Sequence, residues 1–212
     1  MKKTELMARV LDYFGRTMDA TETELDYETP FQLLVAVVLS AQCTDKRINM
    51  VTPRLFADYP TAEALAQASP ETIYEYIKSV SYPHNKARHL AGLGRALAER
   101  FGGQVPRTLE ELTSLPGVGR KTANVVMAVA YGEAALAVDT HVYRVSHRLA
   151  LVPPSADTPY KVEMALRKLI PTHLLAPSHY WLLLHGRYTC TARMPKCDRC
   201  GLAELCKSRR PL

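Results

Sequence analysis

The sequence is poor in cysteine over most of its length and lacks long hydrophobic runs. Only one of its five cysteines, Cys43, lies outside residues 190–206, which excludes a disulfide framework for most of this 212-residue chain. The longest apolar run, LLVAVVL at residues 33–39, is too short to cross a bilayer. The N-terminal MKKTELMARVLDYFG lacks the apolar segment of a secretory signal. We therefore expect a cytoplasmic protein with no membrane association.

Alternation of apolar and polar residues with a period of two is also missing, which argues against β-sheet. Apolar residues recur at helical spacing instead, for example at Met7, Val10, Leu11 and Phe14. Helix starts are expected where a capping hydroxyl precedes proline, at Thr29-Pro30, Thr52-Pro53, Ser69-Pro70 and Thr158-Pro159. The sequence therefore predicts an all-α fold of ten or more helices.

The charge of the chain is uneven. The formal net charge is +6, although residues 1–30 hold seven acidic and only four basic side chains. The last 22 residues hold six basic side chains against two acidic ones. A basic surface of this kind suits a polyanion such as nucleic acid, and a simple solvated face explains the charge equally well.

Four cysteines follow the spacing C-x6-C-x2-C-x5-C at Cys190, Cys197, Cys200 and Cys206. Thiolates bind soft or borderline metals, so the cluster predicts a metal centre. Structural zinc usually uses two C-x2-C pairs, whereas only Cys197 and Cys200 form such a pair here. The uneven short spacings favour an iron–sulfur cluster over zinc, and both favour a metal over four unrelated thiols.

A helix-turn-helix hairpin is predicted from LEELTSLPGVGRKTANVVMAVAYG, residues 109–132. The glycines of its PGVG turn permit positive φ and a close approach of the backbone to a ligand. The turn leads into a helix whose first N–H groups have no internal partner, and such amides bind phosphate. Alone, however, PGVG is as typical of an ordinary helix connection.

Two polar residues near the hairpin have the chemistry of a catalytic pair. Lys121 lies in the first turn of the second helix, where the positive end of the helix dipole favours the neutral, nucleophilic amine. Asp139 precedes another helical segment and is well placed as its N-cap. The same carboxylate could accept a proton or offset a developing cation. A phosphate contact for the lysine and simple capping for the aspartate remain the alternatives.

The combination of LPGVGRKTAN, AVDTHVYRV and HGRYTC with the cysteine spacing resembles the endonuclease III family of helix-hairpin-helix DNA glycosylases. The resemblance covers nearly the whole chain, including TPFQLLVAVVLSAQCTD at residues 29–45. It implies a base-excision repair enzyme that acts on double-stranded DNA with a flipped-out damaged base. Such an enzyme removes oxidised pyrimidines and then cleaves 3′ to the abasic site by β-elimination. It would work as a monomer, associated with the nucleoid in a bacterium.

The resemblance also assigns roles to residues of this sequence. Lys121 would attack the sugar and form a Schiff base, and Asp139 would activate it. The four clustered cysteines would ligate a [4Fe–4S] cluster. Gln42 would fill the gap left by the flipped base. The remaining expected DNA contacts are Tyr82, Leu115, Gly117, Val118, Gly119, Arg120, His141, Arg144, Arg193 and Lys196.

The implied architecture is a two-lobe all-α fold with a cleft between the lobes. A six-helix lobe, residues 22–133, carries the hairpin, and residues 1–21 and 134–212 form the iron–sulfur lobe. One segment departs from the family pattern: in SVSYPHNKARHL, residues 79–90, Ser81 stands where glycine is usual and Pro83 follows Tyr82. Tyr82 is therefore expected as the residue that wedges into the duplex, and Cys43 is expected to pack.

Two other functions are compatible with parts of the sequence. A mismatch-type glycosylase, acting on adenine or on thymine or uracil, generally lacks the lysine at position 121, and adenine-specific relatives extend further beyond the cysteines. A non-catalytic, metal-stabilised module that binds damaged DNA explains the charge, the hairpin and the cysteines. It leaves Lys121 and Asp139 unexplained, so the catalytic reading is favoured.

Overall fold

The computed structural model describes residues 1–18 and 23–209, and this part of the chain contains helices and no strands. The predicted all-α fold is therefore confirmed. The α-helices are α1 (Lys3–Thr17), α2 (Pro30–Ser40), α3 (Asp45–Asp58), α4 (Ala62–Ala66), α5 (Pro70–Ile77), α6 (Pro83–Phe101), α7 (Leu109–Thr113), α8 (Arg120–Tyr131), α9 (Thr140–Arg148), α10 (Pro159–Arg167) and α11 (Leu175–Tyr188). Three short 3₁₀ helices are η1 (Thr172–Leu174), η2 (Cys197–Arg199) and η3 (Ala203–Leu205).

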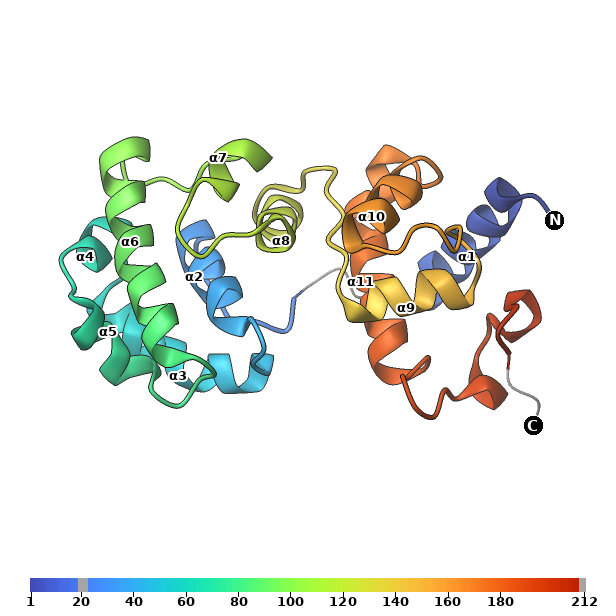
Figure 1. The fold of residues 1–212 in the computed structure, drawn as a ribbon, viewed down its shortest axis with the longest axis horizontal. Coiled ribbons are helices and arrows are strands. Elements are labelled where there is room, and N and C mark those ends of the chain that lie inside the picture. The colour runs from blue at the N-terminus through green and yellow to red at the C-terminus, as the bar shows by residue number, and fades with distance from the viewer. Residues whose placement is uncertain (19–22, 210–212) are drawn as a thin grey trace. The chain divides into compact units, whose positions relative to one another are not determined.

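The chain divides into two compact units, labelled by their helices in Figure 1. Unit 1 comprises Met1–Glu22 and Glu133–Leu212, and unit 2 comprises Thr23–Gly132. Unit 1 is thus built from both ends of the chain, whereas unit 2 is one continuous segment. The junction expected at residues 21 and 22 lies outside the described residues.

Unit 2 is organised around α2, whose residues from Phe31 to Leu39 are all buried. Helix α2 contacts α3, α6 and α8. The apolar run at residues 33–39 is therefore covered by neighbouring helices of the same unit. Helix α6 also lies against α4 and α5. The approach of α6 to α4 requires Gly94, because a Cβ there would come within 2.8 Å of the Ala66 backbone nitrogen. The unit contains α2 to α8, of which α4 and α7 are short helices of five residues each.

Three of the four predicted proline-marked helix starts are confirmed. The hydroxyls of Thr29, Ser69 and Thr158 accept hydrogen bonds from backbone amides in the first turns of α2, α5 and α10. The start predicted at Thr52-Pro53 is wrong, since Pro53 lies inside α3. Helix α3 already begins after Thr44, which caps it, and the buried Thr52 hydroxyl donates instead to the Ile48 carbonyl at 3.1 Å.

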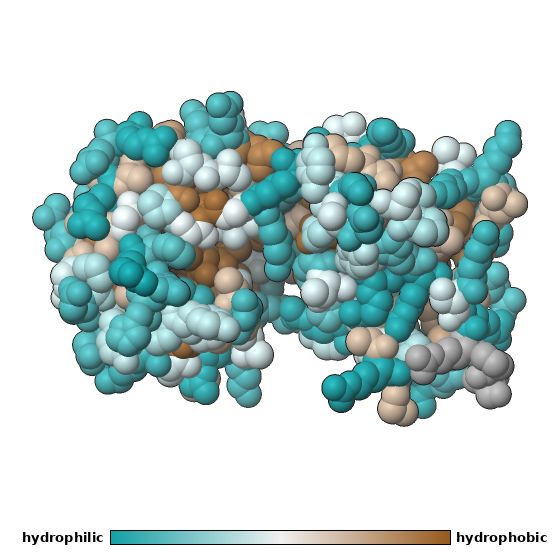
Figure 2. All heavy atoms as spheres, in the orientation of Figure 1, coloured by the Kyte–Doolittle hydropathy of each residue, from teal (hydrophilic) through white to brown (hydrophobic). Residues whose placement is uncertain are grey.

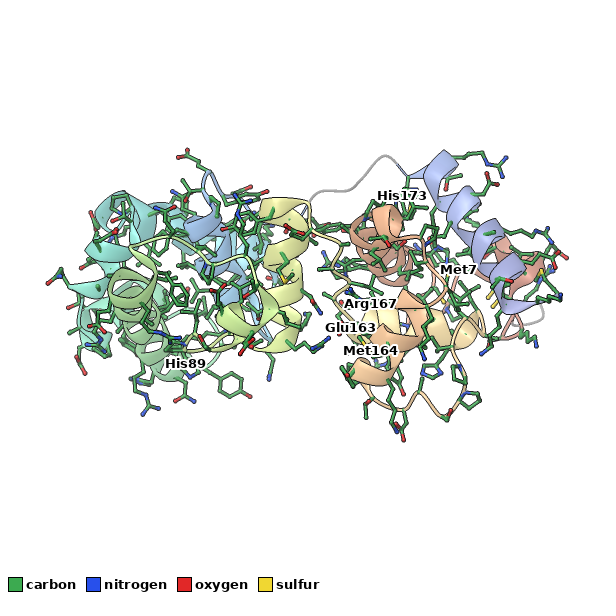
Figure 3. The ribbon with its side chains drawn as sticks, turned by 90° about the horizontal axis from the view of Figure 1, so that it is seen from above. Met7, His89, Glu163, Met164, Arg167 and His173 are labelled. Carbon is green, nitrogen blue, oxygen red and sulfur yellow. The ribbon has the colours of Figure 1, made fainter. Side chains whose placement is uncertain are left out.

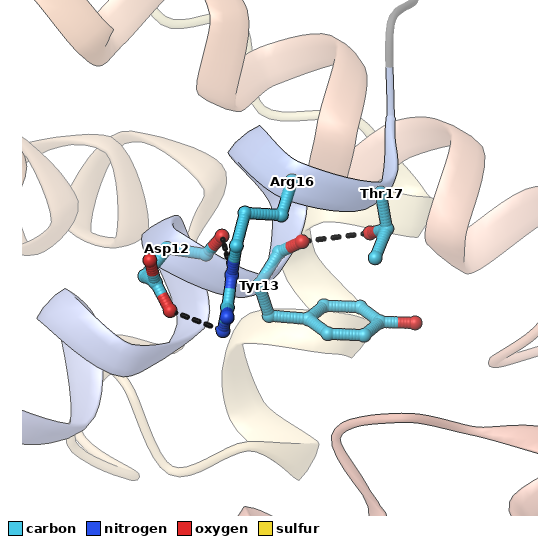
Figure 4. Close-up of polar contacts among 4 residues, drawn as sticks. All are labelled: Asp12, Tyr13, Arg16 and Thr17. Carbon is cyan, nitrogen blue, oxygen red and sulfur yellow. Dashed lines mark hydrogen bonds and ion pairs between the residues drawn. The ribbon is translucent and has the colours of Figure 1, made fainter.

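Unit 1 has a separate core in which α1 lies against α11. The Phe14 ring stacks on Trp181 at a centroid distance of 6.2 Å and meets the His185 ring edge-on at 5.4 Å. Helix α11 approaches α9 closely at Gly186, where a Cβ would lie 2.8 Å from the Cβ of His141. On the solvent side of α1, Arg16 pairs with Asp12 and the Thr17 hydroxyl donates to the Tyr13 carbonyl at 2.7 Å (Figure 4).

The surface is mostly hydrophilic on the face that Figure 2 shows, with smaller hydrophobic areas between the hydrophilic side chains. Within the residues described, no helix combines the length and the hydropathy of a membrane span. Among the exposed large hydrophobic side chains are Tyr82 in unit 2 and Met194 in unit 1.

Candidate functional site

The predicted hairpin is present in unit 2 as α7, a tight turn and α8. The Val118 amide donates to the Leu115 carbonyl at 3.1 Å and closes the turn. Leu115 and Val118 are buried in the core of the unit, so the turn is anchored by its apolar residues. Gly117 has φ of 78°, and a Cβ there would lie 2.9 Å from the Cβ of His89 on α6. Only glycine fits this position without strain; His89 is labelled in Figure 3.

Helix α8 begins without a side-chain cap. Its N-cap is Gly119, with φ of −88°, which has no side chain to accept a hydrogen bond from the first turn. A Cβ added at Gly119 would meet no atom within 4 Å, so the space beside this residue is open. The first amides of a helix have no partner in the helix itself, and the helix dipole attracts anions to this end. The start of α8 is therefore suited to a phosphate group.

Lys121 is the second residue of α8 and is exposed. Among the described residues of unit 2, no hydrogen bond or ion pair joins the Lys121 amine to another side chain. An amine that is not held by a carboxylate keeps its lone pair accessible once it is deprotonated. The residue therefore has the exposure that a nucleophile needs.

Asp139 begins α9 in unit 1 and is its N-cap, as predicted. Its Oδ1 accepts hydrogen bonds from the backbone amides of His141 and Val142, both at 2.8 Å. The preceding segment Ala135–Val138 is buried and fixes the chain before the cap. Because both amide bonds end on one oxygen, Oδ2 is the atom with capacity for a further partner.

Two exposed residues of unit 2 have left-handed backbone conformations although neither is glycine. Gln42 has φ of 55° and follows α2, and Tyr82 has φ of 52° and precedes α6. Tyr82 is 61% exposed. Both were predicted to contact DNA, and the structure brings both to the surface of unit 2.

The four clustered cysteines of unit 1 line one pocket, which is partly open to solvent. Burial raises the pKa of the Cys200 and Cys206 thiols. The Cys200 sulfur lies 3.7 Å from Nε2 of His185, and burial lowers the pKa of that ring to about 4, so the ring is neutral at pH 7. All four thiols thus line a single, partly open pocket.

The four thiols share one pocket, although no group of three or more His, Cys, Asp or Glu side chains in the described chain is gathered tightly enough to hold one metal ion. The spacing of the cysteines along the sequence is what favours an iron–sulfur cluster over zinc.

Two arginines of α9 organise this region, and the sequence reasoning assigned neither of them this role. Arg148 donates to the carbonyls of Thr191 and Ala192 at 2.7 and 2.8 Å and lies 3.3 Å from the Cys190 sulfur. Arg144 donates to the carbonyls of Cys190 and Gly186 at 3.0 and 2.8 Å. Their spacing of four residues places both on one face of α9, which is the signal that could have identified them.

The contacts of Arg144 bear on its predicted role. Its guanidinium also lies 3.1 Å from Nδ1 of His141, so much of its donor capacity is used inside unit 1. A DNA contact by Arg144 or His141 stays a prediction. Arg193 and Lys196, by contrast, are exposed in the segment that follows Cys190.

The predicted residues form two groups, one in each unit. Unit 2 contains Gln42, Tyr82, the hairpin and Lys121, and unit 1 contains Asp139, the α9 residues, the cysteines and the basic segment between Cys190 and Cys197.

Comparison with known proteins extends these observations. Residues 35–172 match the HhH-GPD superfamily of base excision DNA repair proteins, and residues 190–206 match the iron–sulfur binding domain of endonuclease III. The endonuclease III of Synechocystis sp. is 51% identical over 97% of this chain and 94% of that protein. The endonuclease III of Bacillus subtilis is 44% identical over 93% of this chain and 90% of that protein.

Solved structures are similar over almost the whole chain. A trapped endonuclease III–DNA covalent intermediate, an estranged-adenine complex, superimposes with a TM-score of 0.92 at 42% identity, covering 98% of this chain and 97% of that one. A non-covalent endonuclease III–DNA complex gives a TM-score of 0.90 at 42% identity, covering 98% and 96%. A thermostable thymine-DNA glycosylase, 24% identical with a TM-score of 0.85 and coverage of 98% and 96%, shares the fold.

Proposed function

We propose that this chain, which belongs to the endonuclease III family of HhH-GPD base excision repair proteins, removes oxidised pyrimidines from duplex DNA with Lys121 as nucleophile. It is a bifunctional DNA glycosylase and abasic-site lyase, like the relatives whose names and DNA complexes it matches. The identity of the lesion and the roles of single residues belong to the proposal.

The reaction begins with the lone pair of the Lys121 amine. The nitrogen attacks C1′ of the deoxyribose, the bond from C1′ to the base breaks, and the base leaves with a proton. The sugar ring then opens and a Schiff base joins the lysine nitrogen to C1′. Loss of a C2′ proton breaks the bond from C3′ to its phosphate oxygen, and hydrolysis releases the lysine. The exposure of Lys121 at the start of α8 supports this role.

Asp139 is proposed to assist this step through its charge. Its carboxylate would accept the proton that the lysine amine must lose and offset the positive charge that develops on the sugar. The two amide bonds to Oδ1 hold the group at a fixed orientation while Oδ2 keeps its capacity for a partner. A cap and a catalytic carboxylate are thus compatible in one residue.

DNA binding is proposed to use both units. In unit 2 the open start of α8 would take a phosphate, with Leu115 to Arg120 along the backbone. Attack at C1′ requires the damaged base outside the stack, and Gln42 and Tyr82 would occupy the duplex where it was. In unit 1 the exposed Arg193 and Lys196 would meet further phosphates. One chain carries all of these groups, so we infer that it acts as a monomer.

The protein carries an iron–sulfur cluster, as its match to the iron–sulfur binding domain indicates. We propose a [4Fe–4S] cluster held by Cys190, Cys197, Cys200 and Cys206, which line one pocket. When bound, the cluster would hold the four cysteines covalently and act mainly as a scaffold for the basic loop between Cys190 and Cys197. The residues between Cys190 and Cys197 would then be held as a rigid basic loop.

The observation that carries the proposal is the uncapped, open start of α8 with an unengaged lysine one residue later. Incubating the protein with a duplex that contains one oxidised pyrimidine, in the presence of borohydride, should give a covalent protein–DNA adduct. Lys121→Gln should reduce adduct formation at least roughly 1,000-fold, as expected for removal of a nucleophile. Lys78→Gln, an exposed lysine of the same unit paired with Glu75, should leave it unchanged. Adduct at the wild-type level from Lys121→Gln would refute the assignment.

A further inference from the structure

The two left-handed residues of unit 2 sit in segments that are far apart in the sequence but share one buried contact. Gln42 lies in the turn after α2, and Tyr82 lies directly before α6. Left-handed conformations of residues other than glycine persist where the surrounding structure holds them, and they concentrate at functional sites. The group that holds both segments is therefore informative.

That group is Lys86, in the first turns of α6 and only 5% exposed. Its amine donates to the carbonyl oxygens of Leu39 and Ala41 at 2.8 and 2.7 Å, and to the hydroxyl of Ser81 at 2.9 Å. An ammonium group has three protons, so all of its donors are used. We call Lys86, Ser81 and the Ala41 carbonyl the clasp.

Ser81 closes the clasp. Its hydroxyl donates to the Ala41 carbonyl at 3.1 Å while it accepts from Lys86. The segment before Gln42 and the segment before Tyr82 are thus joined twice, once directly and once through the lysine. Because Ala41 and Ser81 are each one residue away from a left-handed residue, the clasp fixes the backbone where the two exposed side chains leave the surface.

A purely structural explanation accounts for part of this arrangement. The carbonyls at the end of α2 lack helical partners, and a cation at a helix C-terminus is favourable. Neutral groups could satisfy these carbonyls, however, whereas a buried charge must be compensated by its partners. Burial lowers the pKa of the Lys86 amine, as expected for an ion removed from water. A helix cap alone also leaves the bond to Ser81 unexplained.

We propose that Lys86 is a positioning residue, which holds Gln42 and Tyr82 at a fixed separation so that they enter the DNA duplex as one preorganised pair. The inference deepens the proposed function and rests on it. Opening the stack around a damaged base is unfavourable, and a pair that is already ordered adds no further loss of conformational freedom. Ser81 contributes the hydroxyl that couples the two segments.

The test compares two DNA substrates that differ in their need for the pair. Excision from a duplex with one oxidised pyrimidine requires the base to leave the stack, whereas Schiff-base formation with a single-stranded abasic oligonucleotide does not. Lys86→Met should lower the excision rate on the duplex by about 10- to 100-fold, as a displacement of about 1 Å does elsewhere. Trapping of the single-stranded abasic oligonucleotide should stay within about twofold of wild type. Lys78→Met is the matched control and should change neither.

A second set of variants separates positioning from folding. Ser81→Ala keeps the lysine and its two carbonyl bonds, so it should fold normally and show a smaller loss confined to the duplex. In a Gln42→Ala, Tyr82→Ala background, Lys86→Met should add less than about a twofold further loss, because a positioning residue acts only through what it positions. Equal losses on both substrates, or a full additional loss in that background, would overturn the inference. So would unchanged excision by Lys86→Met.

One readout is independent of the chemistry. The fluorescence of a 2-aminopurine base next to the lesion rises when the stack opens, and this rise on binding should be smaller for Lys86→Met than for wild type. A wild-type protein that traps neither substrate would refute the proposed nucleophile, whereas the fluorescence would still report on the clasp. An equal fluorescence rise for both proteins would refute the clasp.

Discussion

Helix α9 begins with a side-chain cap and helix α8 begins without one. We interpret the first helix start as stabilising the fold and the second as a place where a ligand can bind. Helix α9 starts at Asp139, whose carboxylate accepts two of the first amide protons at 2.8 Å. Helix α8 starts at Gly119, which offers no side chain and faces open space. Both helices have the same unsatisfied amides at this end. In unit 1 the Asp139 carboxylate accepts hydrogen bonds from the first amides of α9. In unit 2 no N-cap side chain does so for the first amides of α8.

The difference indicates where an external anion is expected. Glycine at an N-cap costs only about a few tenths of a kcal/mol relative to serine or aspartate, so α8 can do without a side-chain cap at little cost in stability. Most other helices of unit 2 are capped by a hydroxyl, among them α2, α5 and α7. Helix α6 also begins without a side-chain cap, but only α8 follows the Gly117 turn and precedes Lys121. On these grounds we expect the phosphate at the start of α8.

The largest effect is expected at Asp139, where a cap and a catalytic charge are proposed to coincide. Asparagine caps helices about as well as aspartate, so Asp139→Asn should change the free energy of unfolding by only a few tenths of a kcal/mol. It removes the charge, so the base-excision rate should fall by about 10²- to 10⁴-fold. Single-turnover excision and urea unfolding of the same preparations measure the two effects.

Asp139→Ala provides the matched comparison. It removes the charge and the cap together, so it should lose activity as Asp139→Asn does and also about 1 kcal/mol of stability. DNA affinity should stay close to wild type in both variants. If Asp139→Asn retains full excision activity, the residue is only a cap, and the contrast between the two helix starts would have no catalytic meaning.

The second prediction makes α8 begin as α9 does. Gly119→Asp fits the backbone there, with φ of −88° and open space for the side chain. The new cap should raise the free energy of unfolding by about 0.5–1 kcal/mol. It should also weaken binding to undamaged duplex DNA roughly tenfold or more, because a carboxylate would occupy the place of a phosphate. Gain of stability with loss of affinity is the diagnostic pair, measured by urea unfolding and fluorescence anisotropy.

Gly119→Ser serves as the control, since serine caps without charge. It should raise stability less than Gly119→Asp and weaken binding less. If Gly119→Asp binds DNA as tightly as wild type, phosphate does not dock at the start of α8.

Much of the fold could be predicted because its signals are local. Helical spacing at Met7, Val10 and Phe14 gave α1 and its buried face, and threonine or serine before proline gave three true helix starts. The same rule failed at Thr52-Pro53 because it cannot tell whether the preceding residues are already helical. Helix α3 is capped by Thr44, eight residues before Thr52, so the Thr52-Pro53 pair lies inside a helix that has already started.

The candidate site shows the same division. The cysteine spacing predicted the iron–sulfur centre because its ligands lie within 17 residues. The clasp could not be predicted, since Lys86 bonds to carbonyls 45 and 47 residues away in the sequence. Every residue has a backbone carbonyl, so the sequence does not indicate which carbonyls a buried lysine will contact. Only the folded structure shows this. The roles of Lys121 and Asp139 stay predictions that the variants above test.

The third prediction concerns the turn that presents the open end of α8. Gly117 and Gly132 flank this helix, with φ of 78° and 64°. Alanine at either position should cost about 1–2 kcal/mol of stability for the left-handed backbone. Gly117→Ala should cost more, because its Cβ would lie 2.9 Å from that of His89, whereas nothing lies near Gly132. Only Gly117→Ala should also weaken DNA binding. Equal losses of affinity would mean that the turn has no special part in binding.

The smallest expected effect is on the salt dependence of DNA binding. It distinguishes a charged side chain from an uncharged backbone amide as the group that contacts the phosphate in each unit. In unit 2 the proposed phosphate contact is made by uncharged backbone amides at Gly119. In unit 1 it is made by the exposed cations Arg193 and Lys196, between Cys190 and Cys197. Only a cation displaces a condensed counterion, so Lys196→Gln should reduce the slope of log affinity against log salt by about 0.9. Gly119→Ser should weaken binding without changing that slope. Anisotropy titrations over a range of salt concentrations give both values. A slope change in Gly119→Ser and none in Lys196→Gln would reverse the assignment, placing the charged contact in unit 2.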